Sequence, residues 1–394
     1  MKHGALMMIT ALAPSVAGAA GYYLPNQDAY ATAKGNAYVA TADSAASVFY
    51  NPAGMTQLQK AQAQAGVYSI VLGNSARVGG VKTDVKDELQ MAPHLYYVSP
   101  INDRLAYGFG LNTPFGLGSD WGRGTNFGSV VTEARLAYLS ATPAIAWKVT
   151  DELSIGASIS ANYADLTLEQ APGGPGSYLG FDGDGFGVSG TLSARWQPHE
   201  QHAFGLLYST KSTFDLDGKT TTNIPGLAYD GNADMDFMAP ARAAFGYSYR
   251  PAPGWNIEAN IEWLDWDALD TLTLETNSVP GTTQIPVAFE WKSSFIYELG
   301  ASYMTENGYV FAAGYDFNEN AQPDANFNPG VSDADRHWFN VGFGRKMDFA
   351  TWMLSYQFGY SNRTVTGATG AAAPANGKYE ARHNALVFSW QQDF

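Results

Sequence analysis

The feature that most constrains the fold is a two-residue alternation that continues for about ten residues at a time. Between residues 153 and 163, one set of side chains is apolar or aromatic, and the set between them is small and polar. The first set is Leu153, Ile155, Ala157, Ile159, Ala161 and Tyr163, and the second is Ser154, Gly156, Ser158, Ser160 and Asn162. Because successive side chains of a strand point to opposite faces, each set predicts one face of a strand.

The same alternation recurs at residues 105–111, 255–263 and 352–360. In the last two segments aromatic residues close both ends of the apolar row, as the interfacial girdles of a membrane barrel require. Only 15% of the residues are charged and 14% are aromatic, whereas about 25% are charged in a typical globular domain. After the extreme N-terminus no run of about 20 apolar residues follows, which argues against a membrane helix. The pattern predicts an all-β transmembrane barrel with a polar interior.

The connections between the alternating segments are of two kinds. Six are short turns, and seven are longer segments rich in Gly, Asn, Asp and Pro. The short turns lie at 100–103, 150–151, 197–199, 251–254, 306–308 and 345–348, and the long segments near 73–89, 114–130, 170–184, 215–235, 270–288, 319–335 and 362–377. Thirteen connections predict 14 antiparallel strands, an even number with short periplasmic turns and long outer loops. A pair of soluble β-sandwiches is disfavoured because strands of a dozen residues are longer than usual.

The two ends of the chain carry export signals. Residues 1–19 combine Lys2, an apolar stretch and a final Ala17-Gly18-Ala19, which predicts a cleaved signal peptide. At the other end, Leu386, Phe388, Trp390 and Phe394 fall on one face of the last strand, a pattern that the outer-membrane assembly machinery reads. The chain has no Cys, and its net charge of −15 argues against nucleic acid as a partner. We expect a location in the bacterial outer membrane, in contact with lipid and lipopolysaccharide.

Residues 20–58 do not alternate and precede a barrel expected over residues 59–394. Two Ala-rich stretches, 27–34 and 40–48, predict short helices, with Asp43-Ser44 as the N-cap of the second. Asn51-Pro52-Ala53-Gly54 then breaks the run, because Pro cannot continue a helix. Fourteen strands enclose a lumen too wide for wall side chains to fill, so a small helical plug is expected there. A periplasmic tail is the alternative.

This N-terminal segment strongly resembles the hatch of FadL-type transporters of long-chain fatty acids and other hydrophobic compounds. The similarity is carried by the Ala20-Gly21-Tyr22 start and the Asn51-Pro52-Ala53 motif, and more weakly by residues 98–103, 114–117, 238–240 and 335–338. The resemblance implies 14 strands, a hatch, and an inward kink in the third strand that lets solutes leave sideways. It also implies that movement of Gly21, Tyr22, Tyr23 and Leu24 releases the ligand. Passive transport by a monomer is expected, without cofactor or energy source.

The third strand contains a physical reason for such a kink. Pro114 cannot donate a hydrogen bond to the ladder, and a Pro inside a strand belongs at an edge or a bulge. The gate candidates are Asn112, Thr113, Pro114, Phe115 and Gly116. Alternatively, Pro114 simply ends the strand. In the following loop Leu117, Trp121 and Phe127 are candidates for a capture groove, since exposed apolar patches mark binding. A loop folded on its own small core is the alternative.

A fatty-acid carboxylate would need a cation in the lumen. Alternation places five basic residues inward, namely Lys148, Arg195, Lys211, Arg242 and Lys292. We favour Arg242, which lies in a strand of small residues after Pro240. Each cation could instead pair with an inward acid, namely Glu258, Glu262, Glu290 or Glu298. An uncharged aromatic or alkane hydrocarbon therefore fits as well as a fatty acid.

Other function classes find little support in the sequence. No Ser lies in a G-x-S-x-G nucleophile elbow. His199-Glu200-Gln201-His202 sits on an expected turn and lacks a third metal ligand. Asp182-Gly183-Asp184-Gly185 lacks the remaining positions of a calcium loop, so we interpret it as a turn. We expect neither enzymatic activity nor a metal site. A general porin for small polar solutes remains a further alternative, and finding residues 21–58 outside the lumen would favour it.

Overall fold

The computed structural model describes residues 21–86, 89–224, 230–279 and 282–394. The predicted signal peptide, residues 1–19, and Ala20 lie outside the described residues. The strands are β1 (Gln62–Val78), β2 (Val81–Asp84), β3 (Leu89–Asn102), β4 (Leu105–Asn112), β5 (Leu117–Asp120), β6 (Glu133–Lys148), β7 (Leu153–Gln170), β8 (Leu179–His199), β9 (His202–Ser209), β10 (Ser212–Thr222), β11 (Gly231–Ala239), β12 (Arg242–Tyr249), β13 (Trp255–Leu264), β14 (Thr271–Val279), β15 (Thr282–Ala288), β16 (Ser294–Met304), β17 (Tyr309–Asn318), β18 (Arg336–Lys346), β19 (Ala350–Val365) and β20 (Gly377–Asp393).

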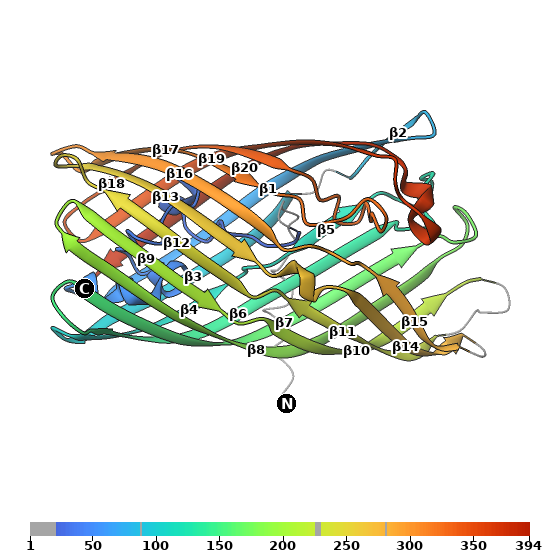
Figure 1. Ribbon diagram of the computed structural model, residues 1–394, viewed down its shortest axis with the longest axis horizontal. Helices are drawn as coiled ribbons and strands as arrows, with labels where there is room; N and C mark the ends of the chain where they lie inside the picture. Colours follow the sequence, from blue (N-terminus) through green and yellow to red (C-terminus); the bar gives the residue numbers. More distant parts are fainter. Residues whose placement is uncertain (1–20, 87–88, 225–229, 280–281) are drawn as a thin grey trace.

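These segments form a closed antiparallel barrel of 14 strands, as the sequence predicted. The barrel closes where β1 pairs with β20, from Gln62↔Asp393 to Arg77↔Lys378. Five of the 14 barrel strands are interrupted and consist of two labelled segments each (Figure 1). The pairs of segments are β4 and β5, β9 and β10, β11 and β12, β13 and β14, and β15 and β16. β2 adds a short hairpin to the outer end of β1. Among the described residues, no helix has the length and apolar character needed to cross a membrane.

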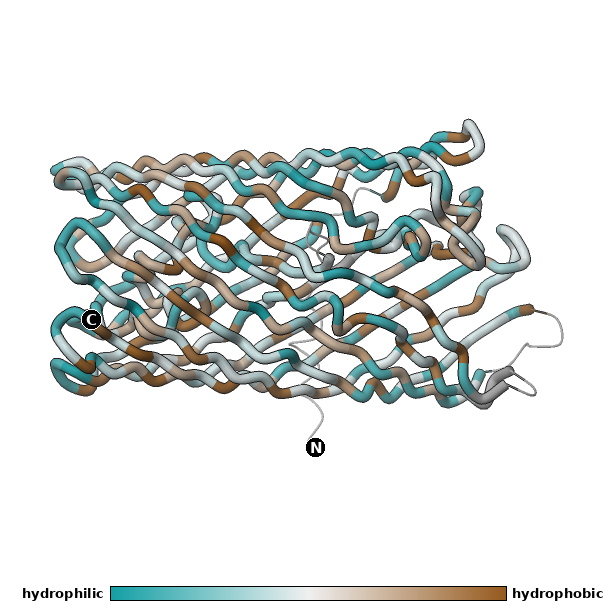
Figure 2. Tube along the Cα trace, in the orientation of Figure 1, coloured by the Kyte–Doolittle hydropathy of each residue, from teal (hydrophilic) through white to brown (hydrophobic). Residues whose placement is uncertain are grey.

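The predicted alternation is confirmed along the walls. On β7, Ile155 and Ile159 are 42% and 64% exposed, whereas Ser154 and Ser158 are buried toward the lumen. Hydrophobic and hydrophilic residues alternate along the strands in the same way over much of the barrel (Figure 2). The residues of the C-terminal apolar row, including Phe388 and Trp390, are also exposed on the outer face. A lipid-facing outer wall and a polar inner wall follow from this two-residue period.

Six short turns lie at or within a few residues of the predicted positions, but residues 197–199 belong to β8 and the turn follows them, and several outer loops are shorter than expected. Strands extend into the ranges 73–89, 215–235 and 270–288, because β1 with β2, β10 with β11, and β14 with β15 continue the ladder there. The interpretation of Asp182–Gly185 as a turn is wrong, because these residues lie within β8. These ranges are rich in Gly, Asp and Thr, so the sequence pattern did not indicate that the strands continue into them. Polar residues outside the bilayer still form strands when the neighbouring strand continues the hydrogen-bond ladder.

Residues 21–58, which we call the N-terminal segment, lie inside the ring of strands (blue in Figure 1). They contain α2 (Ala29–Ala33), α3 (Ser47–Tyr50) and the 3₁₀-helix η1 (Pro52–Gln57). The prediction of a helix over 40–48 capped by Asp43-Ser44 is wrong, because α3 begins only at Ser47 and has no side-chain cap. Asn51 ends α3, and its side chain accepts a hydrogen bond from the Ala53 amide to cap η1. The Asn-Pro motif therefore joins two helices.

Two further 3₁₀-helices lie in connections, η2 (Trp266–Ala268) and η3 (Gly370–Ala375).

Glycines in the wall leave room for the N-terminal segment. A Cβ on Gly156 of β7 would overlap the backbone of Pro52, and one on Gly314 of β17 would overlap that of Lys34. The backbone of the segment therefore lies directly on the inner wall.

Candidate functional site

The third barrel strand is broken at the position where the sequence placed the gate. β4 ends at Asn112 and β5 begins at Leu117, and both pair with β6. Asn112 is opposite Ser140 and Leu117 is opposite Leu136, so four residues on one side face three on the other. This surplus of one residue is the signature of a bulge. We call residues 113–116 the kink.

The start of the N-terminal segment pairs with the kink. Tyr23 and Phe115 form an antiparallel bridge, in which the Leu24 amide donates to the Pro114 carbonyl over 2.8 Å and the Gly116 amide to the Tyr22 carbonyl over 2.9 Å. The side-chain amide of Gln27 donates to the Thr113 carbonyl (2.7 Å) and accepts from its amide (3.2 Å). Residues 21–27, which we call the N-terminal strip, thus satisfy backbone groups that the kink withdraws from the ladder.

The break also interrupts the hydrogen-bond ladder between β3 and β5. β3 pairs with β1 from Leu89 to Val98, but it pairs with β4 only from Leu95 onward. β5 pairs with β6 alone. Along residues 89–94, β3 therefore has no ladder partner on the side of β5 among the described residues. We call this interruption the lateral window.

Two cavities of opposite character lie on either side of the N-terminal strip. The first, of about 160 Å³, is lined mainly by apolar side chains of β6, β7, β8, β11, β14 and β15, and Tyr22 forms part of its wall. The second, of about 60 Å³, is lined by Tyr23, Pro114, Phe115 and Arg242 together with many Ser and Thr side chains of β6 to β10. We call them the apolar cavity and the hydroxyl-lined cavity. Adjacent residues of the strip thus lie on the walls of two different cavities.

Tyr22 is held in an aromatic cluster. Its ring centroid lies 4.6 Å from that of Trp266 and 5.5 Å from that of Phe237, and its hydroxyl donates to the Met238 carbonyl. Gly21 has a φ of +68°, and a Cβ there would lie 2.6 Å from the rings of Trp266 and Trp291. Only glycine fits this position without displacing an indole ring.

Arg242, the predicted carboxylate partner, lines the hydroxyl-lined cavity but has partners of its own. Its guanidinium donates to Glu262 (2.9 Å), to the Tyr23 hydroxyl (2.6 Å) and to the Phe49 carbonyl (2.9 Å). Arg195 is also buried, and it donates to the Ala40 carbonyl. Lys211 and Lys292 are exposed, so their predicted inward orientation is wrong, whereas Lys148 is part-exposed at the end of β6 and pairs with Asp151. Each lies beside a turn or an end of a strand, where the alternation no longer fixes the face.

Two of the predicted capture residues, Trp121 and Phe127, do not line the apolar cavity. Trp121 is buried, and its indole donates to the Pro329 carbonyl over 3.0 Å. Its ring packs edge-on against that of Phe127, which in turn contacts Tyr379. These two residues form a small core among the outer loops, the alternative that the sequence left open. The side chain of Leu117 lies outside the described part of the structure, and a binding role for the three residues stays a prediction.

Comparison with known proteins identifies the family. Residues 10–394 match the family described as outer membrane protein transport protein (OMPP1/FadL/TodX). The chain belongs to this family. It is a bacterial outer-membrane protein. The long-chain fatty acid transport proteins of Salmonella typhi and of Escherichia coli K12 are each 22% identical to it, over 86% of this chain and 86% and 87% of their own lengths.

Solved structures of FadL/TodX-type proteins share the fold. A Pseudomonas aeruginosa FadL homologue superimposes with a TM-score of 0.82 at 18% identity, covering 95% of this chain and 99% of the homologue. The Pseudomonas putida toluene transporter TodX superimposes with a TM-score of 0.79 at 20% identity, with the same coverage of both chains. The relatives thus include proteins named for fatty acids and proteins named for toluene.

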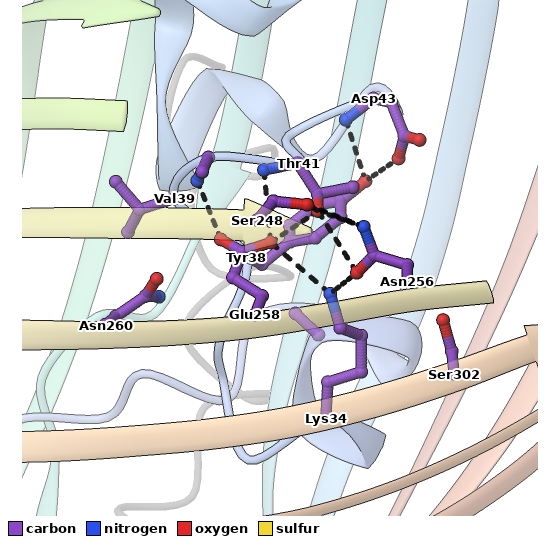
Figure 3. Close-up of polar contacts among 12 residues, drawn as sticks. Lys34, Tyr38, Val39, Thr41, Asp43, Ser248, Asn256, Glu258, Asn260 and Ser302 are labelled. Atoms are coloured by element: carbon purple, nitrogen blue, oxygen red, sulfur yellow. Dashed lines mark hydrogen bonds and ion pairs between the residues drawn. The ribbon is translucent and has the colours of Figure 1, made fainter. Parts of the chain in front are cut away.

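In this FadL/TodX-family chain, one buried carboxylate ties the N-terminal segment to the wall (Figure 3). Glu258 of β13 accepts from the amides of Ala40 (2.7 Å) and Thr41 (3.1 Å), from the Thr41 hydroxyl, and from the Lys34 ammonium (3.4 Å). The side chains of Lys34 and Glu258 are both fully buried. Burial lowers the pKa of Lys34, and the neighbouring Glu258 opposes that shift. The Lys34 ammonium also donates to Asn256 over 2.5 Å.

Sequence reasoning missed the two glutamines that contact the broken strand. Gln27 lies in a stretch predicted as helix, but it precedes α2 and reaches the kink. Gln90 lies on β3, and its side-chain amide donates to the Gly118 carbonyl of β5 over 3.2 Å. Gln90 does not depart from the local pattern, because a polar residue facing the lumen is what the alternation predicts, and Gln27 lies in a segment without alternation. Only the three-dimensional path of the third strand distinguishes them.

Proposed function

We propose that this chain mediates passive uptake of hydrophobic compounds, captured in the apolar cavity and released sideways through the lateral window. The observation that carries the proposal is the N-terminal strip, which walls the apolar cavity with Tyr22 and pairs with the kink through Leu24 and Gln27. A displacement of the strip would therefore affect the capture site and the kink together. Gly21, Tyr22, Tyr23 and Leu24 are the moving part in this account.

The lining of the apolar cavity favours an uncharged solute. Its wall contains Leu, Val, Ile, Phe and Met side chains from six strands, and Glu169 is its only charged residue among those described. An ionised carboxylate would find no cation there, and burying it unpaired would be costly. An apolar cavity of about 150 Å³ is large enough to bind benzene, and this one has about 160 Å³. A compound with a single aromatic ring matches both its chemistry and its size.

A long-chain fatty acid is the second candidate, and Arg242 favours it. This cation lines the hydroxyl-lined cavity beside Pro114 and Phe115, where a departing carboxylate could meet both it and the Ser and Thr hydroxyls. The charge of Arg242 is already balanced by Glu262. A carboxylate would therefore have to compete with an existing ion pair.

The direct test is uptake of radiolabelled toluene and oleate by outer-membrane vesicles, with and without deletion of residues 112–115. We expect the intact chain to take up toluene and the deletion to abolish that uptake, because it removes Pro114 and most of the kink with which the N-terminal strip pairs. Circular dichroism of the purified variant checks that the barrel has formed. Uptake of neither solute by the intact chain, or uptake unchanged by the deletion in a folded barrel, would contradict the proposal.

The role of Arg242 is tested separately with the double variant Arg242→Met/Glu262→Met, which removes both charges and leaves neither one buried alone. If a carboxylate meets Arg242, oleate uptake should fall about tenfold while toluene uptake stays the same, since one charge-assisted hydrogen bond contributes about 1.5–3 kcal/mol. Equal loss for both solutes would indicate a structural role for the pair. Unchanged oleate uptake would exclude Arg242 as the carboxylate partner.

A further inference from the structure

The lateral window is bridged by a side chain where the backbone ladder is missing. Among the described residues, the amide of Gln90 forms the only hydrogen bond between residues 89–94 of β3 and residues 113–120. Gln90 faces the lumen and is only 8% exposed. Its Oε1 atom is buried and has no hydrogen-bond partner. At the outer end of the window, Lys86 contacts Asp120 of β5 through both its backbone and its side chain.

A second glutamine, Gln27 of the N-terminal strip, contacts the kink from the lumen side. The Gln27 amide makes the two hydrogen bonds with Thr113 that a neighbouring strand would make, one as donor and one as acceptor. The kink is thus held on the inside by an amide of the N-terminal strip, and the wall beyond it is held by an amide of β3. On its other edge, the stretch 89–94 of β3 pairs with β1 through an uninterrupted ladder.

We propose that Gln90 is the latch of the lateral window, and that Gln27 is the inner latch that couples the window to the N-terminal strip. This inference rests on the proposed function. An intramolecular hydrogen bond contributes a net stability of about 0.5–1.5 kcal/mol, so each latch opens far more readily than a ladder of ten paired residues. The window can therefore open while the barrel stays intact. The buried, unpaired Oε1 of Gln90 lowers the cost of opening further, because it gains a partner when it becomes accessible.

Opening can be measured without any transport assay, because the chain contains no Cys. Ser140 of β6 lines the hydroxyl-lined cavity behind the kink and is 4% exposed. In a Ser140→Cys background, the rate of labelling by N-(1-pyrenyl)maleimide in lipid vesicles reports access from the membrane. A sulfonated, water-soluble maleimide reports access from the aqueous mouths.

Gln90→Leu keeps the side-chain size and removes the hydrogen bond. We expect it to raise the labelling rate by the pyrenyl reagent about threefold to tenfold, which is the population shift that loss of one hydrogen bond produces. Labelling by the water-soluble reagent should not change. Gln357→Leu is the matched control, since Gln357 is also a buried glutamine in a hydrogen bond, here with Tyr68, and lies on β19, which pairs with neither β3 nor β5. It should leave both rates unchanged.

Equal labelling in Gln90→Leu and Gln357→Leu would overturn the latch. So would a rise seen only with the water-soluble reagent, which would locate the opening at a mouth of the barrel. Failure of the latch and failure of the proposed function can be told apart. Faster pyrenyl labelling combined with toluene uptake that is insensitive to deletion of residues 112–115 would support the latch and reject lateral release. Unchanged pyrenyl labelling in Gln90→Leu, combined with toluene uptake that is lost on deletion of residues 112–115, would reject the latch and leave the proposed function in place.

Discussion

At the scale of single residues, Glu258 is a buried contact between the barrel wall and the N-terminal segment. Four donors converge on its carboxylate, three of them from Ala40 and Thr41 and the fourth from Lys34. Breaking a buried ion pair from one side costs about 3–5 kcal/mol, because the remaining charge is left uncompensated. The two partners are unequal, since Glu258 without Lys34 keeps three hydrogen-bond donors, whereas Lys34 without Glu258 keeps one neutral acceptor, the Asn256 oxygen, and two aromatic rings.

We therefore predict that Glu258→Gln loosens the N-terminal segment more than Lys34→Met does. Limited proteolysis of folded protein in detergent measures this directly, as the rate of cleavage within residues 28–58. The double variant should be cleaved more slowly than Glu258→Gln, because it leaves no buried ammonium unpaired. Faster cleavage in Lys34→Met than in Glu258→Gln would show that the carboxylate is not the dominant anchor.

At the scale of elements, the outer ends of five neighbouring strands carry acids directly opposite one another. In register, Asp165 of β7 faces Asp184 of β8, which faces Asp217 of β10, and that residue faces Asp234 of β11. Asp234 in turn faces Glu275 of β14. These acids point outward and lie beyond the aromatic pair Tyr163 and Phe186, which we assign to the outer interface. Like charges directly opposite each other on a sheet are destabilising.

Asp217→Asn should consequently stabilise the barrel by about 0.2–1 kcal/mol, since it removes repulsion from two neighbours at once. The measurement is thermal unfolding in detergent at low salt, with Asp348→Asn in the exposed β18–β19 turn as the control. The gain should shrink in high salt, because exposed charges are then screened. A melting temperature that is unchanged or lowered in Asp217→Asn at low salt would contradict this account of the acidic row.

At the scale of the whole molecule, the wall was predictable from the sequence and the interior only in part. The alternation of residues such as Ile155 and Ser158 fixes which face meets lipid, so the strand number and both faces followed from a local pattern. Pro114, which cannot donate to the ladder, indicated the position of the kink for the same reason. Lys211 and Lys292 were placed on the wrong face because alternation ends where strands end. The contacts of Gln27, Gln90 and Glu258 join elements far apart in sequence, and no local signal encodes such pairings.

In the proposed mechanism, the N-terminal strip must separate from the kink before a solute leaves. Tyr23 and Phe115 are antiparallel bridge partners, and such partners have Cα atoms about 4.5–5.5 Å apart, within the usual range for a disulfide. The cysteine-free chain therefore allows Tyr23→Cys/Phe115→Cys as a reversible lock. Leu95→Cys/Leu111→Cys, a pair in the intact ladder between β3 and β4, is the control.

The most direct measurement is toluene uptake by vesicles holding the locked pair, oxidised and then reduced. Uptake should be lost in the oxidised Tyr23→Cys/Phe115→Cys protein and should return on reduction. The control pair should transport equally in both states. Undiminished uptake through the oxidised, fully cross-linked strip would contradict the account, because a solute would then cross without any separation of strip and kink.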